Sequence, residues 1–246
     1  MSHTAALPPV GGSLVDSIKH AEAAARAAGL VADADAQAAK EAEQAASVKQ
    51  FWPQQWLDCG FVARAERLGL RLYAEQLAQI TIGELQPTAA YKRFCADWSS
   101  HAPAPGRTRA ALMSGGMGTG KSIMALWACL QAQLRRQSWE WLEVARLAEV
   151  YARGHWQTVD RLRAADLVVW DELGDAEDIK GHVWATFKEV LNTRYRARKD
   201  QILVAIPKLE VLQRQVLGEE IVDRIPPELR FDAGDGSLRW ERTNDR

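Results

Sequence analysis

The expected fold follows from eight consecutive residues, Gly115-Gly116-Met117-Gly118-Thr119-Gly120-Lys121-Ser122. It matches the pattern G-x-x-x-x-G-K-[ST] at every fixed position, and its glycines allow a tight turn whose N–H groups converge on an anion. A short apolar run, residues 110–113, precedes it. The residues after it form an amphipathic helical pattern with an apolar face of Ile123, Leu126, Trp127, Leu130 and Leu134. A strand, a glycine-rich turn and a helix in this order predict a phosphate-binding loop rather than a chance match.

The same stretch predicts how a nucleotide is held. The expected contacts are Gly115, Gly116, Met117, Gly118, Thr119, Gly120, Lys121, Ser122 and Ile123. Lys121 is expected to reach the β- and γ-phosphates and to act in catalysis, while the Ser122 hydroxyl is expected to bind Mg²⁺. The positive end of the helix that begins near Lys121 favours phosphate charge. ATP and Mg²⁺ are therefore the predicted cofactors.

A second motif lies at residues 167–172, where an apolar run ends in Asp171 and Glu172. Ligands of open parallel sheets bind beyond the carboxyl ends of the strands, so this pair is expected beside the phosphate loop. Asp171 is predicted to hold Mg²⁺, and Glu172 is predicted to orient and deprotonate an attacking water. The alternative is a solvated acidic turn, since more acidic residues follow in the sequence.

The rest of residues 109–206 alternates between predicted strands and helices. Strands are expected near residues 139–144, 167–170 and 202–206, with helices near residues 146–153 and 183–191. This alternation predicts an α/β fold with a central parallel sheet flanked by helices. Four tryptophans fall in these elements and are expected in the core rather than as stacking platforms for bases: Trp127, Trp141, Trp170 and Trp184.

Composition separates three regions. Residues 1–50 are Ala-rich and predict a helical or partly disordered N-terminal region, residues 51–100 predict a helical linker that docks a partner, and residues 101–246 predict the nucleotide-binding domain. With 31 basic and 32 acidic residues, the net charge of -1 neither demands nor excludes a nucleic-acid partner. The three cysteines lack disulfide or zinc spacing, and no apolar run is long enough to span a membrane. We therefore expect a cytoplasmic protein without membrane association.

Three further segments are more specific than the phosphate motif. They are the strand ending Asp171-Glu172-Leu173-Gly174, the helix ending Asn192-Thr193-Arg194-Tyr195, and Gly218-Glu219-Glu220-Ile221-Val222-Asp223-Arg224. With the phosphate loop they resemble the AAA+ ATPases of the DnaC-type helicase-loader family, over residues 80–239. The IstB-type transposition helpers share most of this pattern, but the last segment favours the loaders. The resemblance implies an ATPase that self-assembles and delivers a replicative DNA helicase onto single-stranded DNA.

The resemblance also implies roles for two arginines. Arg224 matches the arginine that acts as a catalytic finger in the site of a neighbouring subunit, where a cation neutralises transition-state charge on the γ-phosphate. Arg239 matches an arginine that contacts the nucleotide bound to its own subunit. For each of them the alternative is an exposed salt-bridge partner. The chain departs from the family at Ile206, where loaders usually have an asparagine that helps to position the attacking water, so slow hydrolysis is one expectation.

Two questions stay open at the level of sequence. A basic run of Arg194, Arg196, Arg198 and Lys199 either contacts single-stranded DNA or complements the negative end of a helix, and the second interpretation is favoured. The alternative functions are an IstB-type transposition helper and a nucleotide-binding adaptor or inhibitor with little hydrolysis. Ile206 motivates the adaptor, and the intact Glu172 argues against it.

Overall fold

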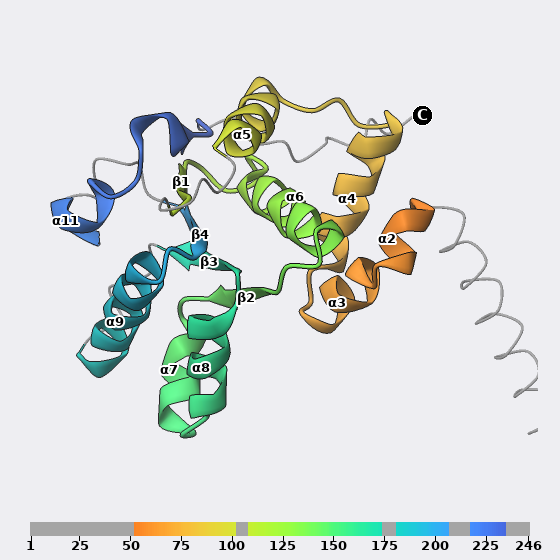
Figure 1. Ribbon diagram of the computed structural model, residues 1–246. Helices are drawn as coiled ribbons and strands as arrows, with labels where there is room; N and C mark the ends of the chain where they lie inside the picture. The colour runs from red at the N-terminus through yellow and green to blue at the C-terminus, as the bar shows by residue number, and fades with distance from the viewer. Residues whose placement is uncertain (1–51, 102–107, 174–180, 207–216, 235–246) are drawn as a thin grey trace, which may run out of the picture. The chain divides into compact units, whose positions relative to one another are not determined.

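The computed structural model describes residues 52–101, 108–173, 181–206 and 217–234. The chain divides into two units, Met1–Trp52 and Pro53–Arg246, and the description below concerns the second (Figure 1). The expectations for residues 1–50 and for Arg239 lie outside the described residues.

A five-stranded parallel sheet forms the centre of this unit. Its strands are β1 (Ala110–Ser114), β2 (Trp139–Glu143), β3 (Leu167–Leu173), β4 (Asp200–Ala205) and β5 (Arg230–Asp232), in the spatial order β2-β3-β4-β1-β5. Every residue of β1 and β4 is buried, as expected for strands covered on both faces. The predicted α/β fold with a central parallel sheet is confirmed.

Helices cover the sheet on both sides. Helix α6 (Lys121–Leu134) packs on β2, β3 and β4, while α9 (His182–Arg196) packs on β4 and α7 (Arg146–Ala152) on β2. Helix α8 (Trp156–Ala164) contacts α7 and α9. Figure 1 shows α6 on one side of the sheet and α7, α8 and α9 on the other. The predicted core residues Trp141 and Trp170 are buried, whereas Trp127 and Trp184 are only half-buried.

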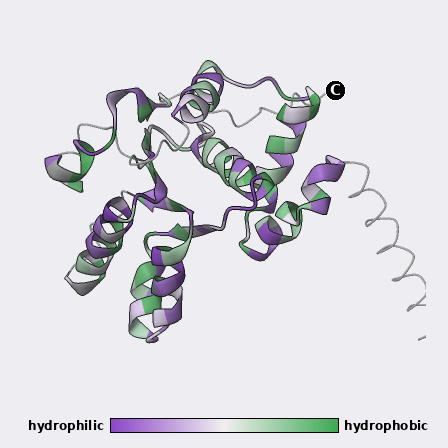
Figure 2. Cartoon of the chain, in the orientation of Figure 1, coloured by the Kyte–Doolittle hydropathy of each residue, from purple (hydrophilic) through white to green (hydrophobic). Residues whose placement is uncertain are grey.

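The helices before the sheet enclose α6 from outside. They are α2 (Gln54–Asp58), α3 (Phe61–Arg67), α4 (Arg71–Ile82) and α5 (Ala89–Ser100), of which α4 and α5 pack directly on α6. Thr88 caps α5, because its hydroxyl accepts a hydrogen bond from the Tyr91 N–H at 3.1 Å. Figure 2 shows that α6 is more apolar than the helices outside it, which agrees with its position between two layers.

The chain returns to the sheet after α11 (Glu219–Val222) and a short 3-10 helix, Pro227–Leu229. Strand β5 then pairs with β1, with Arg230 opposite Leu112 and Asp232 opposite Ser114. The Ala233 N–H continues this ladder by donating to the Ser114 carbonyl at 2.8 Å. The last described residues therefore lie against the start of the phosphate loop.

None of the helices within the described residues is long and apolar enough to cross a membrane.

Candidate nucleotide-binding site

The phosphate loop joins β1 to α6 through glycines in conformations that other residues rarely adopt. Gly118 and Gly120 have φ values of 76° and 87°, and Gly115 has φ 132°. A Cβ atom on Gly115 would lie only 2.8 Å from the Gly234 carbonyl oxygen, and the Gly116 N–H donates to that same oxygen at 2.9 Å. The glycine at position 115 is therefore required both by its backbone angle and by the close approach of Gly234.

Lys121 is buried at the first position of α6. Its Nζ atom donates to the carbonyl oxygens of Gly115 and Gly116 at 2.7 and 2.6 Å, and to the Thr119 hydroxyl at 3.2 Å. Burial lowers the pKa of the Lys121 ammonium, and the neighbouring Asp171 carboxylate acts in the opposite direction. A positive charge is thus held inside the curve of the loop.

Ser122 and Asp171 meet at the carboxyl end of β3. The Ser122 hydroxyl donates to the Asp171 carboxylate at 3.3 Å, and Asp171 is 6% exposed. Burial raises the pKa of Asp171 to about 6, with the Glu172 and Glu143 carboxylates adding to the rise and hydrogen bonds from the Glu172 N–H and Ser122 opposing it. An electron-rich oxygen pair of this kind suits a hard cation.

Glu172 occupies an irregular position in β3. The register between β3 and β4 shifts between Trp170 and Leu173, and Glu172 has a left-handed backbone with φ 57°. Its N–H donates to the Asp171 carboxylate at 2.9 Å, and its side chain is exposed while both of its neighbours in the sequence are buried. Uncommon backbone conformations of this kind concentrate at functional sites, because the surrounding structure must hold them in place.

Tyr73 on α4 is a site residue that the sequence analysis missed. Its side chain lies near Ser122 and near the Asp171 and Glu172 carboxylates. Burial raises the pKa of Tyr73, and the Asp171 carboxylate raises it further. The sequence carried no signal for this contact, because α4 precedes the phosphate loop and reaches it only through its packing on α6.

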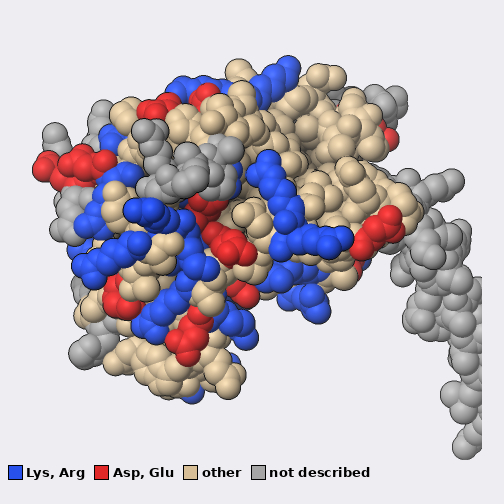
Figure 3. Space-filling view, in the orientation of Figure 1, with Lys and Arg blue, Asp and Glu red and all other residues tan. Residues whose placement is uncertain are grey.

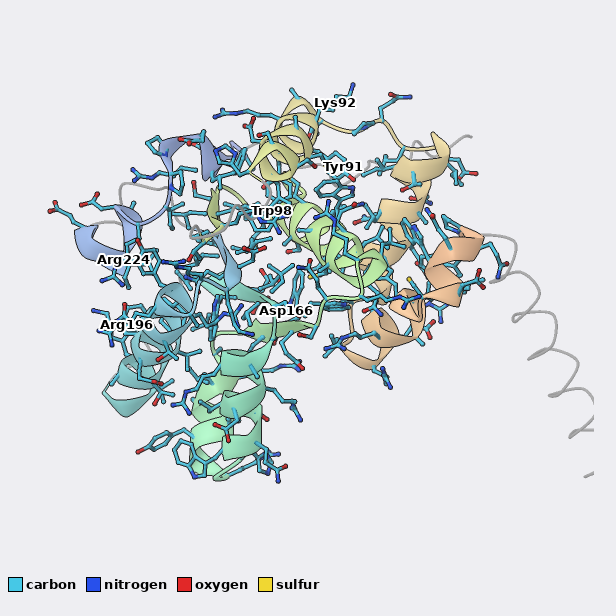
Figure 4. The ribbon with its side chains drawn as sticks, viewed as in Figure 1. Tyr91, Lys92, Trp98, Asp166, Arg196 and Arg224 are labelled. Carbon is cyan, nitrogen blue, oxygen red and sulfur yellow. The ribbon has the colours of Figure 1, made fainter. Side chains whose placement is uncertain are left out.

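The remaining predicted residues lie apart from this constellation. Arg224 follows α11 (Figure 4). Its guanidinium hydrogen bonds to Asn192 and lies over the Tyr195 ring of α9. Ile206 directly follows β4, and its N–H donates to the Leu173 carbonyl at 3.3 Å, beside the irregular end of β3. Arg224 therefore does not join Lys121 and Asp171 within one copy of the chain.

The residues fit a nucleotide with Mg²⁺. Helix α6 begins at Lys121 after the N-cap residue Gly120, and no side chain caps it, so its N-terminal N–H groups face the loop and suit a phosphate. Lys121 supplies a cation, and the Ser122 hydroxyl and Asp171 carboxylate supply the oxygen ligands that Mg²⁺ prefers. These groups fit phosphate oxygens together with a hard cation.

Asp171→Asn is expected to stabilise the metal-free protein. At pH 8 the buried carboxylate is ionised against its raised pKa, so a neutral amide should increase the free energy of unfolding by about 1–3 kcal/mol. The gain should shrink as the pH falls from 6 towards 4, since the folded protein then protonates Asp171. Urea unfolding in EDTA at pH 8 and pH 4.5 measures the free energy of unfolding of the variant and of the wild type. A variant that is no more stable than the wild type at pH 8 would contradict the burial argument.

The basic run at the end of α9 divides into buried and exposed residues. Arg194 is 0% exposed and donates to the carbonyl oxygens of Leu162, Ala165, Asp166 and Asp200. The Lys199 ammonium donates to the Ala164 carbonyl, whereas Arg196 and Arg198 are exposed. Figure 3 shows basic side chains gathered over α9. Only part of this run can therefore meet a phosphate backbone, and Arg194 is a structural residue.

Comparisons with known proteins bear on the fold. No protein-family model matches the chain, and no curated protein matches it in sequence. The crystal structure of DnaI has a TM-score of 0.50 at 15% identity, covering 62% of this chain and 85% of that one. A putative primosome component from Streptococcus pyogenes serotype M3 has a TM-score of 0.50 at 15% identity, covering 68% and 91%.

AMPPCP-bound DnaA from Aquifex aeolicus has a TM-score of 0.50 at 15% identity, covering 63% of this chain and 50% of that chain. The present chain thus spans about half the length of that DnaA structure. At these identities the likeness concerns the fold. The fold expected from the resemblance to DnaC-type helicase loaders is confirmed, since the chain shares its parallel sheet flanked by helices with DnaI and the streptococcal primosome component.

Proposed function

We propose that this chain binds and hydrolyses ATP at the loop between β1 and α6. The observation that carries the proposal is the meeting of Lys121, Ser122 and Asp171 at the carboxyl end of β3, with Glu172 at the adjoining backbone irregularity. A loop, a cation, a pair of oxygen ligands and an exposed carboxylate are the parts that phosphoryl transfer to water requires.

Each residue has a separate task in this proposal. Lys121 turns from the carbonyl oxygens of its own loop towards the β- and γ-phosphates, and the N-terminus of α6 binds phosphate oxygens. Ser122 and Asp171 would hold Mg²⁺, which spreads the charge of the phosphates when it is bound. Glu172 orients a water for in-line attack and takes its proton.

Lys121→Ala tests nucleotide binding directly. The variant removes the buried cation, so its affinity for a fluorescent ATP analogue should fall by at least about tenfold, the loss of one charge-assisted hydrogen bond. Lys92→Ala on α5 removes an exposed lysine and serves as the matched control. Equal affinity of the Lys121 variant and the wild type would show that the loop does not bind a nucleotide.

We further propose that the ATPase self-assembles and delivers a replicative DNA helicase onto single-stranded DNA. The motifs shared with DnaC-type loaders and the fold shared with DnaI support this role. A pull-down and a helicase-loading assay with purified protein test it. Retention of a transposase instead of a helicase would favour the transposition-helper alternative, and ATP binding without any turnover would favour the adaptor.

An exposed aromatic pair supports single-stranded DNA as a partner. Tyr151 at the end of α7 and Trp156 at the start of α8 are 36% and 51% exposed, with ring centroids 5.3 Å apart in an edge-on arrangement. Arg153 lies between them in the sequence and is also exposed. Bases stack on exposed aromatic rings without sequence preference, and nearby cations attract the backbone.

Trp156→Ala is expected to weaken binding to a labelled oligothymidine by about 5- to 150-fold, because stacking of one base contributes about 1–3 kcal/mol. Fluorescence anisotropy at constant salt measures this affinity. Leu72→Ala removes another exposed apolar side chain, on α4, and should leave the affinity unchanged. Unchanged affinity after removal of Trp156 would exclude the aromatic pair as a DNA contact.

A further inference from the structure

Arg224 is held against α9 by two side chains. Its guanidinium donates to the Asn192 side-chain oxygen, and its central carbon lies 5.0 Å from the centre of the Tyr195 ring. Asn192 and Tyr195 are separated by one helical turn, so they lie on the same face of α9. A hydrogen bond on one side and a ring face on the other restrict the rotamers of a long, flexible side chain.

The backbone that carries Arg224 is fixed independently. Arg230 on β5 donates from Nε to the Ile225 carbonyl and from Nη2 to the Val222 carbonyl, both at 2.9 Å. These two carbonyls flank Arg224 in the sequence, so one guanidinium closes the turn around it. Charge-assisted bonds from a planar fork to two acceptors define position as well as energy.

Strand β5 ties this turn to the sheet that bears the phosphate loop. Arg230 lies opposite Leu112 of β1, and residues just beyond β5 bond to Ser114 and Gly116. The turn is therefore anchored to the sheet rather than to a flexible loop. An arginine held in this way is placed in advance, which is the condition under which a charged group stabilises a transition state most strongly.

We propose that Asn192, Tyr195 and Arg230 are positioning residues that aim Arg224 at the γ-phosphate bound by a second copy of this chain. This inference rests on the proposed ATPase function. It also explains the Asn192-Thr193-Arg194-Tyr195 segment. Arg194 bonds to core carbonyls, while Asn192 and Tyr195 hold Arg224. Asn192, Tyr195 and Arg230 act only in the copy that offers the arginine.

That one-sided action can be tested by mixing two full-length variants. Arg224→Ala subunits keep their own site but offer no arginine, and Glu172→Gln subunits offer Arg224 but do not hydrolyse. Neither variant is expected to turn over ATP alone, and their mixture is expected to regain turnover where a Glu172→Gln copy serves an Arg224→Ala copy. Assays are run with and without single-stranded DNA, and KM is measured beside kcat.

Tyr195→Leu is then added to one partner at a time. In the Glu172→Gln partner it should lower the restored kcat by about 100-fold, as expected for a misplaced catalytic group, with KM unchanged. In the Arg224→Ala partner it should change nothing, and Tyr195→Phe, which keeps the ring face, should retain turnover in either partner. Arg230→Lys should behave like Tyr195→Leu, because one ammonium cannot span both carbonyls.

Three results would overturn the inference. One is equal loss from Tyr195→Leu in both partners, which is the signature of a general structural defect. Another is full turnover with Tyr195→Leu in the offering partner. The third is a mixture that never regains turnover although the wild type hydrolyses ATP, which would refute action across subunits and leave the ATPase proposal standing. Absence of turnover in the wild type, in contrast, would refute the proposed function itself.

Discussion

Glu172→Gln is expected to reduce ATP turnover by about 10²–10⁴-fold while ATP binding stays near that of the wild type. Glu172 is exposed at the end of β3, on a left-handed backbone that turns it away from the buried residues on either side. Glutamine keeps the size and the polarity of this side chain but cannot accept the proton of a water molecule. Loss of kcat without loss of affinity is therefore the signature of a missing base.

Phosphate release measured with and without single-stranded DNA, beside binding of a fluorescent ATP analogue, gives both quantities. Glu143→Gln is the matched control, because Glu143 ends the neighbouring strand β2 and pairs in register with Asp171. It should change turnover by no more than a few-fold. If Glu143→Gln were the inactive variant, the assignment of the base would be wrong. If the wild type and both variants all failed to hydrolyse ATP, the adaptor alternative would be supported.

Arg194→Met is expected to lower the free energy of unfolding by about 3 kcal/mol or more, because each buried carbonyl left without a donor costs about 1–3 kcal/mol. The Arg194 guanidinium is fully buried and bonds to carbonyl oxygens from α8, from the residues that lead into β3, and from Asp200 at the start of β4. Methionine fills much of the volume but leaves these buried acceptors without a donor.

Urea unfolding followed by circular dichroism measures this change. Arg196→Met is the matched control on the same turn of α9, where the side chain is exposed, and its effect should stay within about 0.5 kcal/mol. The affinity for DNA should respond in the opposite way: any loss is expected from Arg196→Met, whereas Arg194 is buried and does not contact DNA. A small effect of Arg194→Met on stability would contradict the structural role assigned to that residue.

Local sequence was sufficient to predict most of the sheet. The apolar runs at residues 110–113, 167–170 and 202–206 correspond to β1, β3 and β4, because strands buried on both faces need nearly continuous apolar residues. The strand expected near residues 139–144 corresponds to β2. Strand β5 was missed, since only Phe231 among its residues is apolar and buried. A strand of that length has no periodic signal and forms only because β1 offers it an edge.

The phosphate loop, the acidic pair and the order of strands and helices could be predicted from the residues, because those features depend on backbone chemistry and spacing within short segments. Which charged residues are exposed depended instead on tertiary packing. It buried Arg194 while leaving Arg196 exposed, brought Tyr73 to Ser122, and placed Arg224 against α9 rather than beside Lys121. The physical reason is that burial and long-range contacts arise from packing between segments that are distant in the chain, and no local pattern encodes them.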